Sequence, residues 1–173
     1  MALVPPLHAS PTAVREALAP LRNDFSVALA APGNTFAVGA VIRVAHSFLA
    51  REVFVIGAGD WYRKAAMGMH KYETVVRVDD AEQLRRAIAG RPVWAVEKDF
   101  ARRSICAVER FPEGVVFLLG SERFGLPPDL LALADDVVGI PMYGVNHSFP
   151  VAVAAGIAMH EWARRRYRGG AVM

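Results

Sequence analysis

The sequence predicts an α/β fold in which helices cover both faces of a parallel β-sheet. Short, continuous apolar runs, typical of strands buried on both faces, alternate with segments whose apolar residues recur at helical intervals. The chain has 173 residues, of which 54% are hydrophobic and 21% charged, so it can bury a core and is not a disordered chain. We expect a single domain over residues 1–173, in which residues 1–22 form an N-terminal helical extension.

The expected elements follow from local signals. Ser10 and Pro11 predict a helix start, since serine is a favoured N-cap and proline fits the first turn. Asp80 caps a later helix, which Gly90 ends. The predicted strands cover residues 25–30, 53–57, 74–78, 92–96, 115–119 and 137–140. The predicted helices cover residues 11–21, 38–48, 80–88, 127–134 and 149–168.

Composition excludes several classes of protein. Cys106 is the only cysteine, which rules out an intrachain disulfide and a multi-thiolate zinc site and favours a buried core thiol. The five histidines lie far apart in sequence, and we expect no metal. The longest apolar stretch, residues 151–159, is shorter than the roughly 20 residues of a membrane span. The first residues lack the basic segment of a signal peptide, so we expect a cytoplasmic protein that does not bind membranes.

Basic residues are distributed unevenly. The net charge is +3, and residues 61–110 hold 11 Lys or Arg against 7 Asp or Glu. The last predicted helix also ends in arginines, at positions 164–166 and 168. A modestly basic surface suits a nucleic acid or another polyanion, but ordinary solvated helix faces carry similar clusters. Charge alone leaves both interpretations open.

A dinucleotide-binding fold is the obvious alternative for an α/β chain. Residues 57–59 (Gly-Ala-Gly) follow a predicted strand, but Tyr62 stands where the third glycine of that motif belongs, and Trp61 would crowd a pyrophosphate. The chain also has no Walker loop, no HExxH pair and no Gly-x-Ser-x-Gly elbow. Enzyme classes with such local signatures are therefore disfavoured.

Three motifs in the last third of the chain each stand where a predicted strand ends. They are residues 120–127 (Gly-Ser-Glu-Arg-Phe-Gly-Leu-Pro), 140–144 (Ile-Pro-Met-Tyr-Gly) and 148–150 (Ser-Phe-Pro). Open α/β sheets build ligand sites at such edges. Two glycines five apart allow a tight turn whose backbone can approach a flat ligand, and a mere connection does not need the carboxylate of Glu122. Pro141 stops the strand pairing and leaves neighbouring backbone groups for a ligand.

These motifs, together with residues 39–43 (Gly-Ala-Val-Ile-Arg), resemble motifs 1 to 3 of the SpoU/TrmH-like RNA ribose methyltransferases of the SPOUT superfamily. The resemblance runs from about residue 25 to residue 167. It implies a SPOUT-type domain with a C-terminal trefoil knot, an exception to general topology rules. It also implies transfer of a methyl group from S-adenosylmethionine to a ribose 2′-hydroxyl of RNA, by a homodimer whose site lies near the subunit interface. The chain shows no separate RNA-binding domain, which favours tRNA over rRNA as substrate.

The resemblance assigns roles to individual residues. Cofactor binding falls to residues in the strand-terminal loops: Val96, Gly120, Ile140, Met142, Ser148 and Phe149. Arg43 is placed near the ribose to be methylated, with Glu122 and Ser148 supporting it as catalytic residues. Since a guanidinium stays protonated and only donates hydrogen bonds, we expect Arg43 to orient the RNA and to stabilise the forming alkoxide.

Aromatic and basic residues interleave at positions 61–64 (Trp-Tyr-Arg-Lys) and 69–72 (Met-His-Lys-Tyr). This pattern is typical of proteins that bind single-stranded or looped RNA, although a solvated loop with packed aromatic rings gives the same pattern. We predict that Arg63, Lys64 and Lys71 bind RNA. For the homodimer, we expect an interface on small residues of the last helix, although the same face could pack on the sheet: Val151, Ala154, Ala155 and Ala158.

The chain departs from the family pattern at two positions. Ala37 stands where motif 1 usually has asparagine, and Pro150 stands where motif 3 usually has asparagine. Asn34 and Asn146 lie close by in sequence and are candidate substitutes. The two changes leave open a catalytically weakened SPOUT-fold protein that binds RNA or a partner. An α/β protein that binds a different nucleotide or small molecule also stays open.

Overall fold

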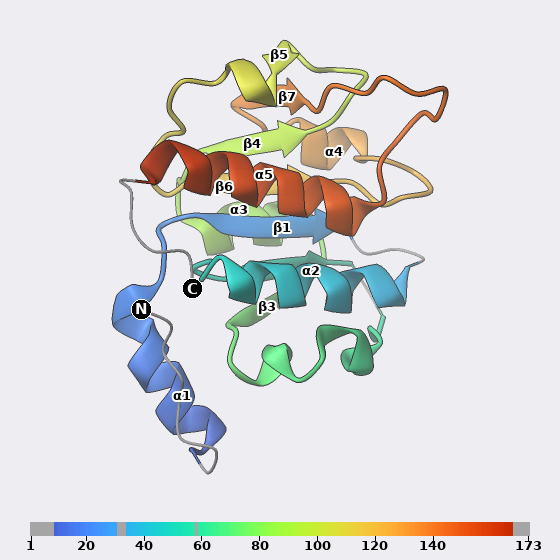
Figure 1. Ribbon diagram of the computed structural model, residues 1–173. Helices are drawn as coiled ribbons and strands as arrows, with labels where there is room; N and C mark the ends of the chain where they lie inside the picture. Colours follow the sequence, from blue (N-terminus) through green and yellow to red (C-terminus); the bar gives the residue numbers. More distant parts are fainter. Residues whose placement is uncertain (1–8, 31–33, 58, 168–173) are drawn as a thin grey trace.

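The computed structural model describes residues 9–30, 34–57 and 59–167. Its centre is a seven-stranded sheet in which every neighbouring pair is parallel, with the order β3-β2-β1-β6-β4-β7-β5 (Figure 1). The strands are β1 (Ser26–Ala30), β2 (Val53–Ile56), β3 (Val75–Val78), β4 (Val93–Val96), β5 (Arg103–Ser104), β6 (Val116–Leu119) and β7 (Asp136–Gly139). The predicted α/β fold with a parallel sheet is confirmed. The trefoil knot stays a prediction.

Helices cover both faces of this sheet (Figure 1). The α-helices of the described residues are α1 (Pro11–Leu18), which lies outside these two layers, α2 (Thr35–Ser47), α3 (Ala81–Ile88), α4 (Pro128–Leu131) and α5 (Val151–Arg166). The helices α2 and α5 lie side by side on one face, and α3 and α4 lie on the other. Alternate residues of β1 divide between the two layers: Val27 and Leu29 belong to the core beneath α2 and α5, and Ala28 and Ala30 to the opposite core.

Side-chain caps start three of the helices. The predicted caps are confirmed, since Ser10 accepts a hydrogen bond from the backbone of α1 and Asp80 from that of α3. Asn34 caps α2 in the same way, because its Oδ1 accepts from the backbone N–H of Ala37 at 3.1 Å. The helix therefore begins at Thr35, three residues earlier than predicted.

Several sequence-based expectations need correction. Cys106 is exposed on a short 3₁₀ helix, η4 (Ile105–Ala107), and is not a core thiol. The strand β5 was not predicted because its two residues form no apolar run. Parts of three expectations lie outside the described residues: 1–8 of the N-terminal extension, Ala58 of the Gly-Ala-Gly segment, and Arg168 of the last helix.

The small-residue face of α5 packs inside the chain. Val151, Ala155 and Ala158 are buried in the core that α5 shares with α2 and the sheet, and Ala154, which is partly buried, packs against that core. The prediction that this face forms a subunit interface is therefore wrong, and the alternative, packing on the sheet, is confirmed. Within the described part of the chain, no helix is long and apolar enough to cross a membrane.

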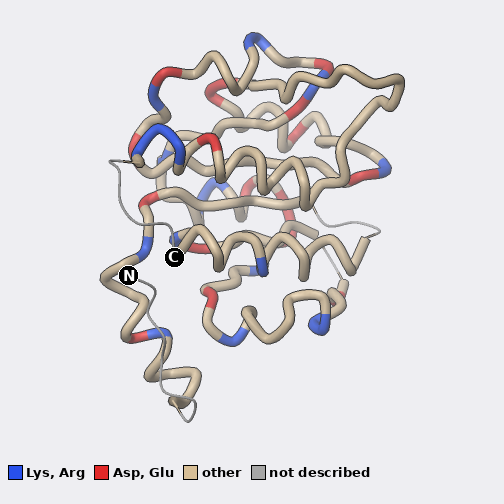
Figure 2. Tube along the Cα trace, in the orientation of Figure 1, with Lys and Arg blue, Asp and Glu red and all other residues tan. Residues whose placement is uncertain are grey.

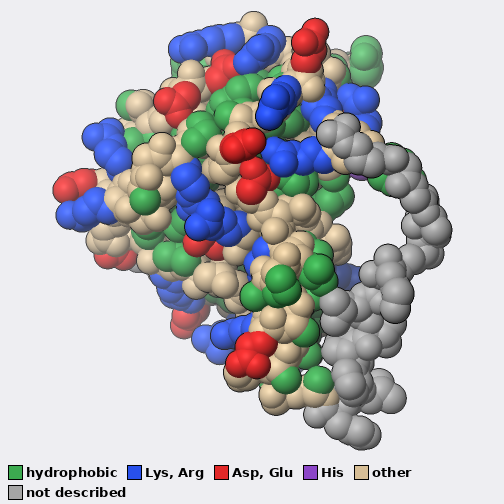
Figure 3. All heavy atoms as spheres, turned by 90° about the vertical axis from the view of Figure 1, so that its left-hand side faces the viewer, with side chains coloured by type: hydrophobic (Ala, Val, Ile, Leu, Met, Phe, Trp, Pro, Cys, Tyr) green, Lys and Arg blue, Asp and Glu red, His purple; other side chains and the backbone are tan. Residues whose placement is uncertain are grey.

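A buried ion cluster ties the N-terminal segment to the amino ends of the strands. Glu73, whose side chain is 0% exposed, accepts hydrogen bonds from both terminal nitrogens of Arg22 at 2.6 and 3.1 Å. The same carboxylate lies 2.7 Å from Nδ1 of His46, near the end of α2. Figure 3 looks onto this end of the molecule, where basic and acidic side chains are interspersed over the coloured part of the surface. The pairing fixes β3 and α2 to the start of β1.

Candidate functional site

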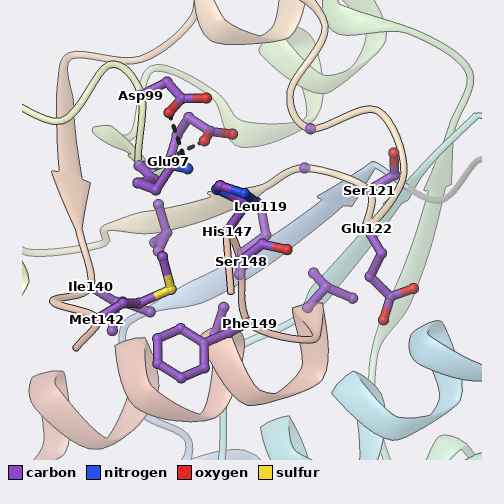
Figure 4. A pocket seen from close by; sticks show the side chains of 16 residues that line it. Glu97, Asp99, Leu119, Ser121, Glu122, Ile140, Met142, His147, Ser148 and Phe149 are labelled. Atoms are coloured by element: carbon purple, nitrogen blue, oxygen red, sulfur yellow. Dashed lines mark hydrogen bonds and ion pairs between the residues drawn. The ribbon is translucent and has the colours of Figure 1, made fainter. Parts of the chain in front are cut away.

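A cavity of about 270 Å³ opens at the carboxyl ends of β4, β6 and β7, beside the start of α5 (Figure 4). Because the strands are parallel, these ends share one edge of the sheet, where open α/β folds place their ligand sites. All six residues predicted to bind the cofactor line this cavity: Val96, Gly120, Ile140, Met142, Ser148 and Phe149. Glu122, predicted to be catalytic, lines it as well. The fold thus brings the three C-terminal motifs together.

The turn after β6 depends on Gly120. A Cβ at this position would lie 2.5 Å from the nitrogen of Leu126 and 2.6 Å from the oxygen of Gly125, closer than a side chain can approach. Two backbone hydrogen bonds between Ser121 and Gly125, of 3.0 and 2.9 Å, close the turn, and Gly125 has a φ of +64°. The predicted tight turn is therefore confirmed, and the approach of its backbone to a flat ligand stays a prediction. The missing side chain lets the turn fold back on itself.

Two asparagines contact the predicted site residues. Asn34, which caps α2 through Ala37, also donates a hydrogen bond from Nδ2 to the carboxylate of Glu122. Asn146 donates from Nδ2 to the backbone oxygen of Ser148 at 3.2 Å. Both asparagines considered as substitutes for the missing family amides thus lie at the site. One of them connects the motif 1 helix directly to the cavity.

Pro150 stands immediately before α5 in the N-cap position. Its carbonyl oxygen accepts hydrogen bonds from the backbone N–H groups of Val153 and Ala154, at 2.9 and 3.0 Å. The helix does not use a donor from this position, so the missing N–H of proline costs it nothing. The departure from the family pattern is therefore compatible with the local fold.

The cavity wall combines apolar side chains with carboxylates. Figure 4 shows Met142 and Phe149 on one side of the cavity and Glu97 and Asp99 on another. Lys98 neutralises part of this charge, since its Nζ lies 3.4 Å from Asp99. Sequence reasoning missed these two acidic residues, although their position directly after a buried strand was an available signal. The wall suits a ligand with a flat ring and a positive charge.

Arg43 lies apart from the cavity. Its side chain is exposed on α2 and does not line the pocket. Among the residues that the structure describes, its guanidinium has no hydrogen-bond or ion-pair partner. The structure therefore does not bring Arg43 together with Glu122 and Ser148 inside one cavity, and leaves its guanidinium accessible from solvent.

The predicted RNA-binding residues lie between β2 and β3, where Figure 2 shows basic positions along the tube. Arg63 and Lys64 begin the 3₁₀ helix η2 (Arg63–Ala66), and Lys71 ends η3 (Met69–Lys71); both helices pack against α2. All three side chains are exposed. Burial and the charges of Arg63 and Lys71 lower the pKa of His70, as expected where positive charges gather. Over the described ranges, no group of three or more His, Cys, Asp or Glu could hold a metal ion.

Comparison with known protein families identifies the fold and the kind of site. Residues 24–160 match the SpoU rRNA Methylase family. The chain belongs to this family. The match spans the segment around Arg43 and all three motifs at the cavity, so the resemblance noted in the sequence is confirmed. The prediction of a methyltransferase is confirmed with it.

Relatives of this SpoU-family chain include two enzymes named "tRNA (guanosine(18)-2'-O)-methyltransferase". The one from Escherichia coli (strain K12) is 26% identical over 90% of this chain and 69% of its own length. The one from Aquifex aeolicus (strain VF5) is 31% identical over 60% of this chain, which spans about half of that protein (49%). The SpoU methyltransferase AviRb from Streptomyces viridochromogenes, solved in complex with the cofactor AdoMet, matches with a TM-score of 0.74 and 27% identity, over 89% of this chain and 62% of AviRb.

Proposed function

We propose that this chain transfers a methyl group from S-adenosylmethionine to a ribose 2′-hydroxyl of tRNA. The observation that carries the proposal is the cavity at the carboxyl edge of β4, β6 and β7, where the three loop motifs of a methylase family meet. The family description mentions rRNA, but the names of the Escherichia coli and Aquifex relatives favour tRNA.

The cavity suits S-adenosylmethionine in shape and charge. The apolar side chains of Met142 and Phe149 match a flat adenine, and the carboxylates of Glu97 and Glu122 match a cationic sulfur. When bound, the cofactor supplies a methyl group on that positively charged sulfur. The residues that would hold it are Val96, Gly120, Ile140, Met142, Ser148 and Phe149. The related AviRb, solved with AdoMet, supports the choice of this cofactor.

The remaining site residues act on the RNA in this proposal. Arg43 is exposed outside the cavity, so we assign it to the RNA and not to the cofactor. Its guanidinium donates to a phosphate beside the target ribose and stabilises negative charge on the 2′-oxygen as the hydroxyl proton passes to water. Glu122, which Asn34 orients, and Ser148 position the ribose at the mouth of the cavity. Rate then comes mainly from orientation and electrostatics.

The basic residues Arg63, Lys64 and Lys71 bind the RNA backbone in this proposal. Contacts to phosphate fix the register of a nucleic acid without reading its sequence. All three side chains are exposed on short helices that pack against α2, the helix that carries Arg43. The RNA therefore runs from η2 and η3 across α2 toward the cavity.

We also propose that the protein acts as a homodimer in the cytoplasm. Tyr143, Val145 and Val153 are exposed apolar residues on the loop and helix that border the cavity, and a second copy would cover them. The site then lies close to the subunit interface. Light scattering at micromolar concentration should give twice the monomer mass, and a monomer mass would contradict this part of the proposal.

Replacement of Arg43 tests the catalytic assignment. We expect Arg43→Ala to reduce methyl transfer to tRNA at least about a hundredfold, equivalent to roughly 3 kcal/mol, and to leave cofactor affinity unchanged. Arg43→Lys should also fail, since a point charge does not reproduce the planar donor fork. Arg85→Ala on α3, on the opposite face of the sheet, removes another exposed arginine and is the matched control.

The same experiment separates the alternatives. A rate like that of the unaltered protein in Arg43→Ala would show that this arginine does not act in catalysis. Binding of S-adenosylmethionine without methyl transfer by the unaltered protein would favour a catalytically weakened RNA-binding or partner protein. Failure to bind the cofactor at all would favour a protein for a different nucleotide or small molecule.

A further inference from the structure

Two aromatic rings form an exposed stacked pair beside the site. Phe36, in the first turn of α2, is 60% exposed, and Tyr62, directly before η2, is 47% exposed. Their ring centroids lie 6.1 Å apart and the ring planes differ by only 19°. By contrast, the rings of Phe25 and Trp162 are tilted relative to each other and buried in the core. Apolar rings that stay exposed to solvent contribute little to the stability of the fold through burial. Exposed apolar groups of this kind are typical of a binding surface.

The backbone holds this pair in place. The N–H of Tyr62 donates a hydrogen bond to the oxygen of Thr35 at 3.0 Å, which joins the segment before η2 to the first residue of α2. Gly39 allows the close approach, because a Cβ there would lie 2.7 Å from Cβ of Ala65 and 2.8 Å from the oxygen of Tyr62. The two rings are therefore positioned by main-chain contacts before any ligand arrives.

The surroundings of the pair are positively charged on one side and lead to the cavity on the other. Arg63 and Lys64 follow Tyr62 directly, and residues 61–72 contain three basic and no acidic residues. In the opposite direction, Asn34 lies two residues before Phe36 and donates to Glu122, which lines the cavity. The pair thus stands between exposed cations and the proposed methylation site.

We propose that Phe36 and Tyr62 form a stacking platform for an unpaired base of the RNA substrate, close to the nucleotide that is methylated. The inference rests on the proposed function, since it specifies how that RNA is held. Bases present a flat π-face whatever their identity, and the phosphates on either side of a stacked base would meet Arg63 and Lys64. A second copy of this chain is a less suitable partner for this surface, because its equivalent surface would bring like charges together.

The test compares a polyanion that carries bases with one that carries none. Binding of a short oligoadenylate and of inorganic polyphosphate is measured for the unaltered protein and for Phe36→Ala, Tyr62→Ala and Lys64→Ala. We expect each aromatic variant to bind oligoadenylate about tenfold more weakly and polyphosphate equally well, since stacking involves the base alone. Lys64→Ala should weaken both. Tyr62→Phe keeps the ring and should retain full affinity.

Controls separate this inference from the proposed function and from misfolding. Phe100→Ala removes a ring that is also 60% exposed, from the loop after β4, and should leave both affinities unchanged.

Unaltered oligoadenylate affinity in both aromatic variants, with RNA binding and methyl transfer intact, would overturn the platform alone. Equal losses for polyphosphate would also overturn it. A lower mass of Phe36→Ala in light scattering would assign the ring to a subunit contact and overturn it as well. Absence of any RNA binding by the unaltered protein would overturn both proposals.

Discussion

Replacement of Gly120 by alanine tests whether the turn after β6 maintains the cavity. The new Cβ would lie 2.5 Å from the nitrogen of Leu126 and 2.6 Å from the oxygen of Gly125, and because these are backbone atoms the turn must open. Opening breaks the two hydrogen bonds between Ser121 and Gly125, each worth about 0.5–1.5 kcal/mol, and overpacking adds about 1–3 kcal/mol. The closed turn should therefore lose roughly 2–6 kcal/mol.

This loss should appear in both cofactor binding and stability. Ser121 and Glu122 line the cavity from the turn, so we expect at least about a tenfold weaker affinity for S-adenosylmethionine in calorimetric titration. Gly156→Ala is the matched control, because a Cβ there meets only Cγ1 of Val44 at an ordinary 3.7 Å. It should keep full affinity and gain about 0.5–1 kcal/mol from its position inside a helix. Equal cofactor affinity and equal stability in the two variants would show that the turn after β6 does not need a glycine at position 120.

Three further predictions concern other parts of the chain. Gly39→Ala should move η2 away from α2, because the new Cβ would lie 2.7 Å from Cβ of Ala65. We expect weaker oligoadenylate binding in fluorescence anisotropy and a stability that is lower by about 1–3 kcal/mol in urea unfolding. Glu73→Ala leaves the guanidinium of Arg22 buried without its carboxylate partner and should lower the stability of the protein by about 3–5 kcal/mol. An unchanged urea midpoint would contradict a stabilising role of this buried ion cluster. Burial alone would raise the pKa of Glu161, but hydrogen bonds from two arginines outweigh it and lower that pKa below its ordinary 4.5. The stability from Glu161 is thus present above pH 4.5 and lost as the pH falls through the lowered pKa, so Glu161→Gln should be less sensitive to acid in unfolding experiments.

The sheet could be predicted because its strands are buried on both faces and leave continuous apolar runs. All six predicted strands occur, and none of their ends is shifted by more than one residue. β5 could not be predicted, because two residues at a sheet edge give no periodicity. The 3₁₀ helices η2 and η3 were also missed, because their position depends on packing against α2 at Gly39 and not on a local signal. Cys106 was misplaced because the residue type favours burial while its short helix lies at the surface.

The site could be predicted as a set of loops but not as a set of contacts. Strand-terminal motifs must meet at one edge of a parallel sheet, and the six loop residues do line one cavity. The hydrogen bond from Asn34 to Glu122 joins positions 88 residues apart and has no signal in the sequence. Glu97 and Asp99 follow a strand in the same way as the recognised motifs, and were missed because no motif contains them. The exposed position of Arg43 depends on how α2 packs, which the sequence alone does not define.

Nucleoside mass spectrometry shows whether this protein transfers a methyl group to a ribose of tRNA. Unmodified tRNA is incubated with the protein and with S-adenosylmethionine that carries an isotopically labelled methyl group, then digested to nucleosides; Arg43→Ala is treated in parallel. We expect label in a 2′-O-methylnucleoside for the unaltered protein and its near absence for the variant. Label on a base, or no labelled nucleoside from the unaltered protein, would contradict methyl transfer to the ribose.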